Sequence, residues 1–136
     1  MTAHRVLQPS GWPAPSGYAN GIVAAGDSIY IGGQVGWDAE GKFADGLAAQ
    51  VGQTLANIAE ILATAGAPPA AIVRLTWFVV DVEDYIRERP AIGRAYVAVM
   101  GKHFPVMSVI GVSRLVEKQA LVEIEATAVM APRGAA

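Results

Sequence analysis

Hydrophobic residues recur along the chain with two different periods, which separate predicted helices from predicted strands. After Gly46, apolar residues are spaced three and four positions apart, a pattern typical of an amphipathic helix; they are Leu47, Val51, Leu55, Ile58 and Leu62. Gly66 supplies a C-terminal stop, and Pro68-Pro69 prevents the helix from continuing. A second helix is expected from about residue 90 to residue 100, with Pro90 in its first turn and Gly101 at its end. Its predicted apolar face consists of Ile92, Tyr96, Val99 and Met100.

The remaining apolar segments predict strands. Residues 21–25 and 29–31 flank the turn sequence Gly26-Asp27-Ser28, which favours a hairpin. The Gly32-Gly33 pair that follows indicates either a close approach of the backbone to another group or a β-bulge. Three further strands are expected over residues 72–81, 107–115 and 120–130, the first of them covered on both faces.

The resulting order, β-β-α-β-α-β-β, predicts an α+β domain with two helices on one face of a mixed, mostly antiparallel sheet. We expect a single domain over residues 17–131, preceded by an N-terminal arm (1–16) and followed by a C-terminal tail (132–136). With 53% apolar and only 16% charged residues, part of the apolar surface is expected to face other copies of the chain.

Composition excludes several classes of function. Ten Lys and Arg against twelve Asp and Glu leave a net charge of -2, which offers no basic field for nucleic acid. The chain has no cysteine for disulfides, thiolate catalysis or zinc, and His4 and His103 are too far apart in sequence for a ligand motif, so no metal site is expected. Without a secretion signal or an apolar stretch of about 20 residues, we expect a cytoplasmic protein that has no contact with membranes.

The last predicted strand contains the most informative polar pattern. Alternation places Glu123 and Glu125 on one face, roughly 6.5–7 Å apart, opposite a face of Val122, Ile124, Ala126 and Ala128. Two carboxylates this close, when partly desolvated, push their pKa values apart, so that one acts as an acid while the other accepts a proton or holds a water. A solvated strand face is the alternative interpretation. Of the three tryptophans, Trp77 is expected in the core, whereas Trp12 and Trp37 lie in loops where they line a pocket or anchor an oligomer.

Taken in order, these segments resemble the RidA (YjgF/YER057c/UK) family of imine and enamine deaminases. The resemblance extends from about residue 17 to residue 128. The residues that carry it are Gly17-Tyr18, Ile29-Tyr30-Ile31-Gly32-Gly33-Gln34, Asp38, Gln50, Gln53, Leu55, Asn57, Ala65-Gly66, Phe104-Pro105, Val112-Ser113-Arg114-Leu115 and Glu123-Ile124-Glu125-Ala126.

The resemblance implies a chorismate-mutase-like fold and a homotrimer with three clefts between its subunits. Members of the family hydrolyse reactive imines or enamines to a keto compound and ammonia without a cofactor. By position, Glu123 corresponds to the glutamate that positions the attacking water, and Tyr18 to a tyrosine of the cleft. Gly32 takes the place of a common serine, and Val109 that of a common cysteine.

One position departs from the family. Deaminating members have Pro-x-Arg-Ser after the second helix, and that arginine binds the substrate carboxylate, whereas this chain has Pro105-Val106-Met107-Ser108. Losing such a contact costs about 1.5–3 kcal/mol for each charged hydrogen bond, or about tenfold to more than a hundredfold in affinity. Arg74, Arg89 and Arg94 are alternative sources of a cation, from a neighbouring subunit, and Arg114 is expected in a structural ion pair.

Two functions are favoured over a third, an interaction or chaperone-like role that rests only on exposed apolar surface. The first is hydrolysis of an imine or enamine that lacks the usual small amino-acid carboxylate. In that case Glu123 holds the water, Tyr18 or Glu125 assists departure of the amine, and Met107, Val109 and Trp77 form an apolar pocket beside Gly32. The second is a non-catalytic, metabolite-binding or regulatory trimer that has kept the cleft between subunits.

Overall fold

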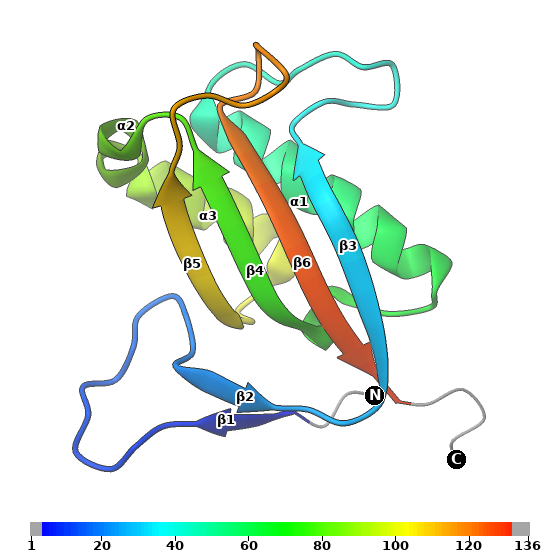
Figure 1. Ribbon diagram of the computed structural model, residues 1–136, viewed down its shortest axis with the longest axis vertical. Coiled ribbons are helices and arrows are strands. Elements are labelled where there is room, and N and C mark those ends of the chain that lie inside the picture. The colour runs from blue at the N-terminus through cyan, green and yellow to red at the C-terminus, as the bar shows by residue number, and fades with distance from the viewer. Residues whose placement is uncertain (1–3, 132–136) are drawn as a thin grey trace.

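A four-stranded mixed sheet forms the centre of the computed structural model, which describes residues 4–131 (Figure 1). The strands lie in the order β3-β6-β4-β5, with bounds β3 Asp27–Val35, β6 Val122–Met130, β4 Ile72–Val79 and β5 Val106–Gly111. Pairing is antiparallel between β3 and β6 and between β6 and β4, and parallel between β4 and β5. The predicted α+β class and the mixed, mostly antiparallel sheet are therefore confirmed.

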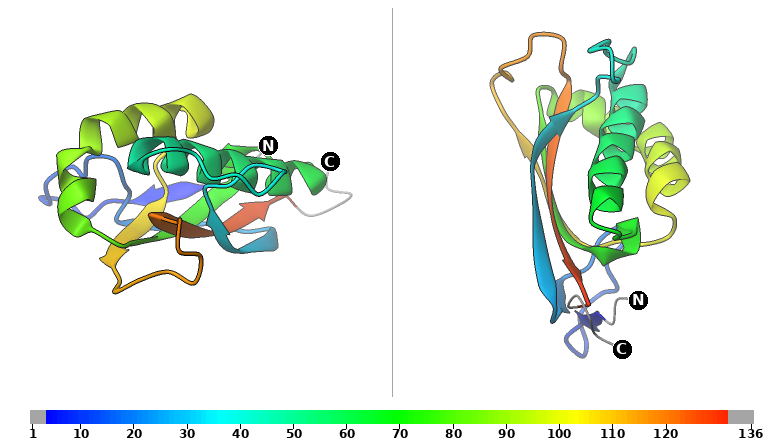
Figure 2. Two further views of the ribbon diagram at one scale, coloured as in Figure 1. Left: turned by 90° about the horizontal axis from the view of Figure 1, so that it is seen from above. Right: turned by 90° about the vertical axis from the view of Figure 1, so that its right-hand side faces the viewer.

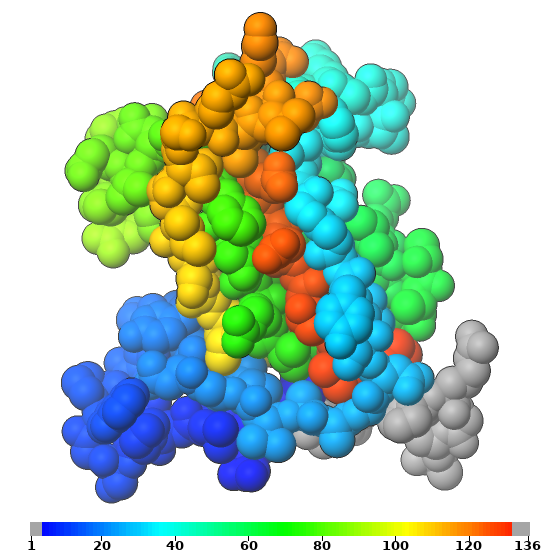
Figure 3. Space-filling model, in the orientation of Figure 1, coloured from blue at the N-terminus to red at the C-terminus, as the bar shows by residue number. Residues whose placement is uncertain are grey.

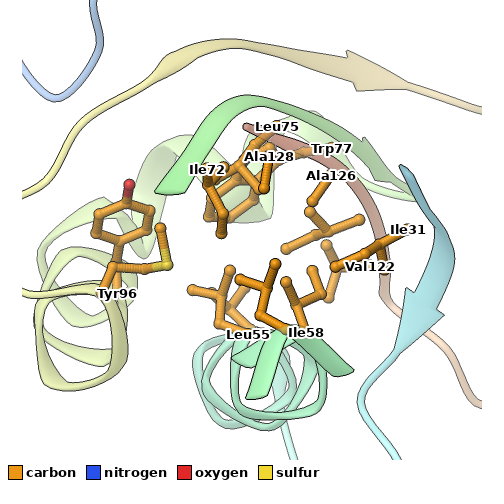
Figure 4. Close-up of a cluster of buried hydrophobic side chains, with 14 of the residues drawn as sticks. Ile31, Leu55, Ile58, Ile72, Leu75, Trp77, Tyr96, Val122, Ala126 and Ala128 are labelled. Atoms are coloured by element: carbon orange, nitrogen blue, oxygen red, sulfur yellow. The ribbon is translucent and has the colours of Figure 1, made fainter. Parts of the chain in front are cut away.

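Two long helices, α1 (Leu47–Thr64) and α3 (Arg89–Met100), cover the same face of the sheet (Figure 2). The apolar positions predicted on α1 are all buried, and they meet inward-facing residues of β4 and β6 (Figure 4). Leu55, Ile58, Leu75 and Ile124 have no exposed surface at all. Hydrophobic burial between helix and sheet thus fixes which face of each strand points inward.

The helix ends follow the predicted signals. Gly66 and Gly101 have φ angles of 76° and 66°, which favour glycine, and each directly follows the last turn of its helix. Two short elements were not predicted. A 3-10 turn, η1 (Pro69–Ala71), leads into β4, and a six-residue helix, α2 (Val82–Arg87), begins where the Asp81 side chain accepts a hydrogen bond from the backbone N–H of Asp84.

The hairpin predicted around Gly26 is wrong. β2 (Gly21–Val23) pairs with β1 (Arg5–Leu7) in a separate two-stranded sheet, whereas β3 pairs with β6. At Gly26, with φ of 142°, a Cβ would lie 2.0 Å from the carbonyl oxygen of Met130, so the chain passes from one sheet to the other against the end of β6. The local turn signal was real, but long-range pairing determined the partners of both strands.

β1 belongs to the segment expected as an N-terminal arm. It joins the domain through β2, and His4 Nε2 lies 3.0 Å from the carbonyl oxygen of Val129 in β6. The expected tail, residues 132–136, lies outside the described residues. Within residues 4–131, no helix is both long and apolar enough to cross a lipid bilayer.

The sheet face away from the helices is open within one chain (Figure 3). β4 was expected to be covered on both faces, but only one is packed by helices. On the open face Arg74 is exposed, while Thr76 and Phe78 are half-buried. β5 is also shorter than expected, because residues 112–121 leave the sheet as a loop. The open face carries Tyr30, which is 79% exposed, and Ile110, which is 44% exposed.

Gln50 on α1 ties the helix to the chain just before β6. Its side-chain nitrogen donates to the carbonyl oxygens of Ala44 (3.2 Å) and Gln119 (3.0 Å), and its oxygen accepts from the Leu121 N–H (2.8 Å). Because the residue is 3% exposed and makes three side-chain hydrogen bonds, Gln50→Ala would remove all three bonds and open a cavity at a buried position. We expect it to lower the free energy of unfolding by about 2–4 kcal/mol in urea titrations.

Gln53 provides the matched control on the same helix. Its side chain donates only to Asn57, at 2.9 Å, and Gln53→Ala should cost less than about 1 kcal/mol. Equal losses for the two variants would contradict the anchoring role of Gln50.

Candidate functional site

Glu123 and Glu125 lie on the open face of the sheet, as the alternation in β6 predicts. The register places Glu123 beside Phe78 and Glu125 beside Thr76. Glu123 is half-buried and Glu125 is exposed, so within one chain the expected desolvation applies to Glu123 alone. The two carboxylates thus occupy different surroundings on one strand face.

Gly33 forms the surface against which the Glu123 carboxylate lies. A Cβ at position 33 would be 2.2 Å from Oε2 of Glu123, whereas a Cβ at position 32 would meet nothing within 4 Å. The β3–β6 register also shifts between Ile31 and Gln34. Both interpretations of the glycine pair therefore hold: the strand bulges there, and its backbone approaches another group. The sequence contained this signal but did not indicate that Gly33, rather than Gly32, touches the acid.

This difference gives a matched pair of variants. Gly33→Ala would force the Glu123 side chain to move, and because the clash is with the end of a flexible side chain, the fold should survive. We expect it to lower turnover about tenfold by displacing the carboxylate, in line with the sensitivity of catalysis to misplaced groups. Gly32→Ala should change turnover by less than about twofold. Steady-state kinetics with a substrate that the protein turns over would check this, and equal effects of the two variants on kcat would argue against contact between Glu123 and Gly33.

A large pocket lies on the helix side of the sheet, between the edge strand β5 and helices α2 and α3. Its volume is about 1070 Å³, at the upper limit of the size range of small-molecule sites. Four of the predicted site residues line it: Tyr18, Trp77, Met107 and Val109. Met107, Val109 and Trp77 thus line one pocket, whereas Gly32, which was expected beside them, does not line it.

Aromatic rings make up much of the pocket wall. Trp77 and Tyr96 are stacked at 6.3 Å, Tyr96 stacks on Phe104 at 5.5 Å, and Tyr85 meets Trp77 edge-on at 6.2 Å. The Tyr96 hydroxyl donates to the carbonyl oxygen of His103 at 2.6 Å, which holds its ring in place. Trp77 thus lies in the core, as predicted, and also lines the pocket.

Tyr18 reaches the pocket from the loop before β2. The backbone N–H of Ala19 donates to the carbonyl oxygen of Pro105 at 3.1 Å, and Ala19 forms an isolated parallel bridge with Val106. The loop thereby lies along the outer edge of β5 and carries Tyr18 to the side of Met107, which it adjoins in a second, smaller pocket as well. Gly17, with φ of 78°, makes the turn that precedes it.

Two cations, Arg89 and Arg94 of α3, line the large pocket. Neither forms an ion pair with any residue between positions 4 and 131. Burial raises the pKa of the Tyr85 hydroxyl, and the positive charge of Arg89 acts in the opposite direction. Burial also raises the pKa of Tyr96. At neutral pH Tyr85 and Tyr96 therefore stay neutral, and Arg89 and Arg94 are the positively charged residues of the pocket lining.

The predicted site residues fall into two groups on opposite faces of the sheet. Met107 pairs with Leu75 and points to the helix side, whereas Ser108 pairs with Thr76 and points to the open side. Glu123 is on that open side. Gly32 and Glu125 line a separate pocket of about 320 Å³ there, together with Tyr30, Arg74, Thr76 and Thr127. One chain by itself does not bring Glu123 to Tyr18 and Met107.

Other residues considered from the sequence lie outside the large pocket. Trp12 is 60% exposed, and Trp37 packs on Phe43 with ring centroids 5.4 Å apart. Arg114 was expected in an ion pair, but it lies in the exposed loop after β5 and pairs with no acid among residues 4–131. In the same described range, no three His, Asp or Glu side chains are grouped so as to hold a metal ion.

Comparison with known proteins places this arrangement in a family. Residues 12–130 match the family described as Endoribonuclease L-PSP. The 2-iminobutanoate/2-iminopropanoate deaminase of Capra hircus is 33% identical over 130 residues, covering 94% of this chain and 91% of the relative. The enzyme of the same name from Salmonella typhimurium is 35% identical over 122 residues, covering 86% and 91%.

Comparison with solved structures leads to the same family. A conserved Rid family protein from Yersinia pestis superposes with a TM-score of 0.81 at 36% identity, covering 93% of this chain and 98% of that one. RidA from an Antarctic Psychrobacter species gives a TM-score of 0.68 at 26% identity, covering 93% and 99%. Sequence and fold together show that this chain belongs to the Endoribonuclease L-PSP family, which is the YjgF/RidA family.

Proposed function

We propose that the protein hydrolyses an imine or enamine to a carbonyl compound and ammonia. The observation that carries this proposal is the placement of Glu123, a half-buried carboxylate lying against the bare backbone of Gly33. Relatives about one third identical over nearly the whole chain are named as imine deaminases, which supports the same reaction class here.

The complete site requires a second copy of the chain. Glu123 is on the open sheet face, while Tyr18 and the aromatic pocket lie at the β5 edge and the helix side. The exposed Tyr30 and Ile110 give that open face apolar surface to bury. In a homotrimer packed through these faces, Glu123 of one subunit meets the large pocket of its neighbour, and three equivalent clefts result.

Hydrolysis then proceeds as acid–base chemistry. Glu123 takes a proton from water as the oxygen forms its bond to the imine carbon and the C=N π bond breaks, and the protonated Glu123 returns that proton to the nitrogen. In the resulting carbinolamine, Glu123 accepts the hydroxyl proton as the C–N bond breaks, which leaves a carbonyl group and ammonia. Tyr18 or Glu125 supplies the proton to the departing nitrogen. The Tyr18 ring is 44% exposed and lines the pocket, so it is the nearer candidate on the pocket side.

The substrate differs from the small imino acids of the named relatives. Met107 stands where the carboxylate-binding arginine is expected, and its thioether offers neither charge nor a hydrogen-bond donor. Together with Val109 and Trp77 it presents an apolar wall. The favoured substrate therefore carries an apolar group, and no small amino-acid carboxylate, next to the reacting carbon.

A panel of imines tests this function. The imines are generated in situ by oxidising the matching amines or amino acids, and ammonia release is compared with the spontaneous rate. We expect the largest acceleration with aromatic or extended apolar imines and a weak one with 2-iminopropanoate. No acceleration for any member of the panel would contradict the proposal.

A non-catalytic, metabolite-binding or regulatory trimer is the second candidate, because Met107 and Gly32 both remove polar groups from the expected site. Saturable binding of the same compounds without turnover would favour it. RNA cleavage, which the family's description suggests, is less well supported, since a net charge of -2 provides no field for binding phosphates.

A further inference from the structure

The large pocket combines aromatic walls with two guanidinium groups at positions that the proposed reaction does not use. We propose that Arg89 and Arg94 bind an anionic group of the substrate. The substrate is then an acid whose carboxylate is separated from the reacting carbon by an apolar body of about aromatic size. The reaction of this substrate rests on the proposed function, whereas the binding of its carboxylate by Arg89 and Arg94 does not.

The position of the two arginines supports this role. Arg89 is the first residue of α3, and Arg94 follows five residues later, about 7.5 Å further along the helix axis. Both line the pocket, and neither is neutralised by an acid within the described residues 4–131. Arg87, by contrast, pairs with Asp84 and lies outside the pocket. Within residues 4–131, Arg89 and Arg94 therefore bring unpaired positive charge to the pocket, whereas Arg87 does not.

The surroundings suit an amphipathic acid. A guanidinium group binds carboxylates in a bidentate manner, and the aromatic rings of the pocket wall provide a surface on which a ligand ring can stack. Arg89 is close enough to Tyr85 for its charge to affect that hydroxyl. The volume of about 1070 Å³ far exceeds what a three- or four-carbon imino acid fills. A ligand whose ring packs against Trp77 and whose remote carboxylate binds the arginines of α3 would use both the aromatic wall and the positive charge.

Equilibrium binding of unreactive probes tests the inference. The probes are 3-phenylpropanoate, its neutral amide and propanoate, titrated by calorimetry against the intact protein. We expect the wild type to bind 3-phenylpropanoate about tenfold or more tightly than either of the other two compounds. Arg89→Gln and Arg94→Gln should each lose about tenfold in affinity for this acid, and the double variant should bind the acid and the amide equally.

Arg87→Gln is the matched control and should leave all three affinities within about twofold of wild type. The inference is overturned if the double variant binds 3-phenylpropanoate as tightly as wild type does, if the amide binds wild type as well as the acid does, or if neither compound binds. Because the probes do not react, the two proposals fail separately. Arginine-dependent binding without imine hydrolysis would refute only the proposed reaction, and hydrolysis with an arginine-independent pocket would refute only this inference.

Discussion

Glu123→Gln is expected to lower kcat for imine hydrolysis by about a hundredfold to ten-thousandfold, the range typical of a lost general base. Glutamine keeps the shape of the side chain and its contact with the Gly33 backbone but cannot accept the proton of the attacking water. KM should change little, because the large pocket that holds the substrate body is untouched. Steady-state ammonia release at saturating substrate measures the effect.

Glu125→Gln is the control on the same strand face. Glu125 is exposed and lines a different pocket from that of Tyr18, the nearer proton donor, so its loss should cost at most about tenfold. Urea unfolding of both variants should match wild type, because neither side chain belongs to the buried core. Turnover by Glu123→Gln at the wild-type rate would remove Glu123 from the mechanism.

Met107→Arg is expected to raise kcat/KM for 2-iminopropanoate by about tenfold to a hundredfold. Met107 is half-buried, faces the large pocket and lies beside Tyr18, so an arginine there would present its guanidinium to a carboxylate next to the reacting carbon. The same change should lower activity on apolar imines, because it places a charge in the apolar pocket wall that binds them.

Two variants at the same position separate charge from shape. Met107→Leu keeps an apolar side chain of similar size and should gain no activity on 2-iminopropanoate, while Met107→Lys supplies charge without a bidentate fork and should gain less than arginine does. A folded, oligomeric Met107→Arg protein with no gain would mean that the loss of this arginine is not what limits small imino acids.

Local sequence patterns were sufficient to predict the helices and strands that bury one face in the core. α1, α3 and the inward side of β6 follow from the spacing of apolar residues, and Gly66 and Gly101 mark the helix ends. The predicted hairpin is wrong because a turn sequence does not specify which strands pair with each other. Gly26 turns the chain from β2 to β3, but β2 pairs with β1 and β3 with β6, at separations no local pattern encodes.

The sequence predicted which face of its strand Glu123 occupies, but not how the candidate residues are arranged relative to one another. Alternation placed Glu123 on the open face, and the resemblance pointed to Tyr18 and Met107. Glu123 and Met107 lie on opposite faces of the sheet because of how β5 and β6 pair with β4. This pairing is known only once the fold is known. The sequence named Arg89 and Arg94 as possible cations from a neighbouring subunit, but only the packing of α3 against the aromatic wall shows that they line the pocket of their own chain.

A variant that blocks the pocket makes the shared site testable. Gly93 of α3 lines the pocket, a Cβ there meets nothing within 4 Å, and its φ is not positive. Gly93→Phe should therefore fold and place a ring inside the pocket, which should strongly lower turnover by obstructing the substrate body while leaving Glu123 intact. Size-exclusion chromatography would verify that it still assembles.

Mixing Glu123→Gln with Gly93→Phe tests most directly whether the site joins two chains. Each homo-oligomer alone should be nearly inactive. After the two are unfolded together and reassembled at equal amounts, half of the pockets are intact, and half of those face an intact Glu123. Roughly a quarter of the wild-type activity should then return. A mixture that stays as inactive as its components, despite forming mixed oligomers, would contradict a site built from Glu123 of one subunit and the pocket of its neighbour.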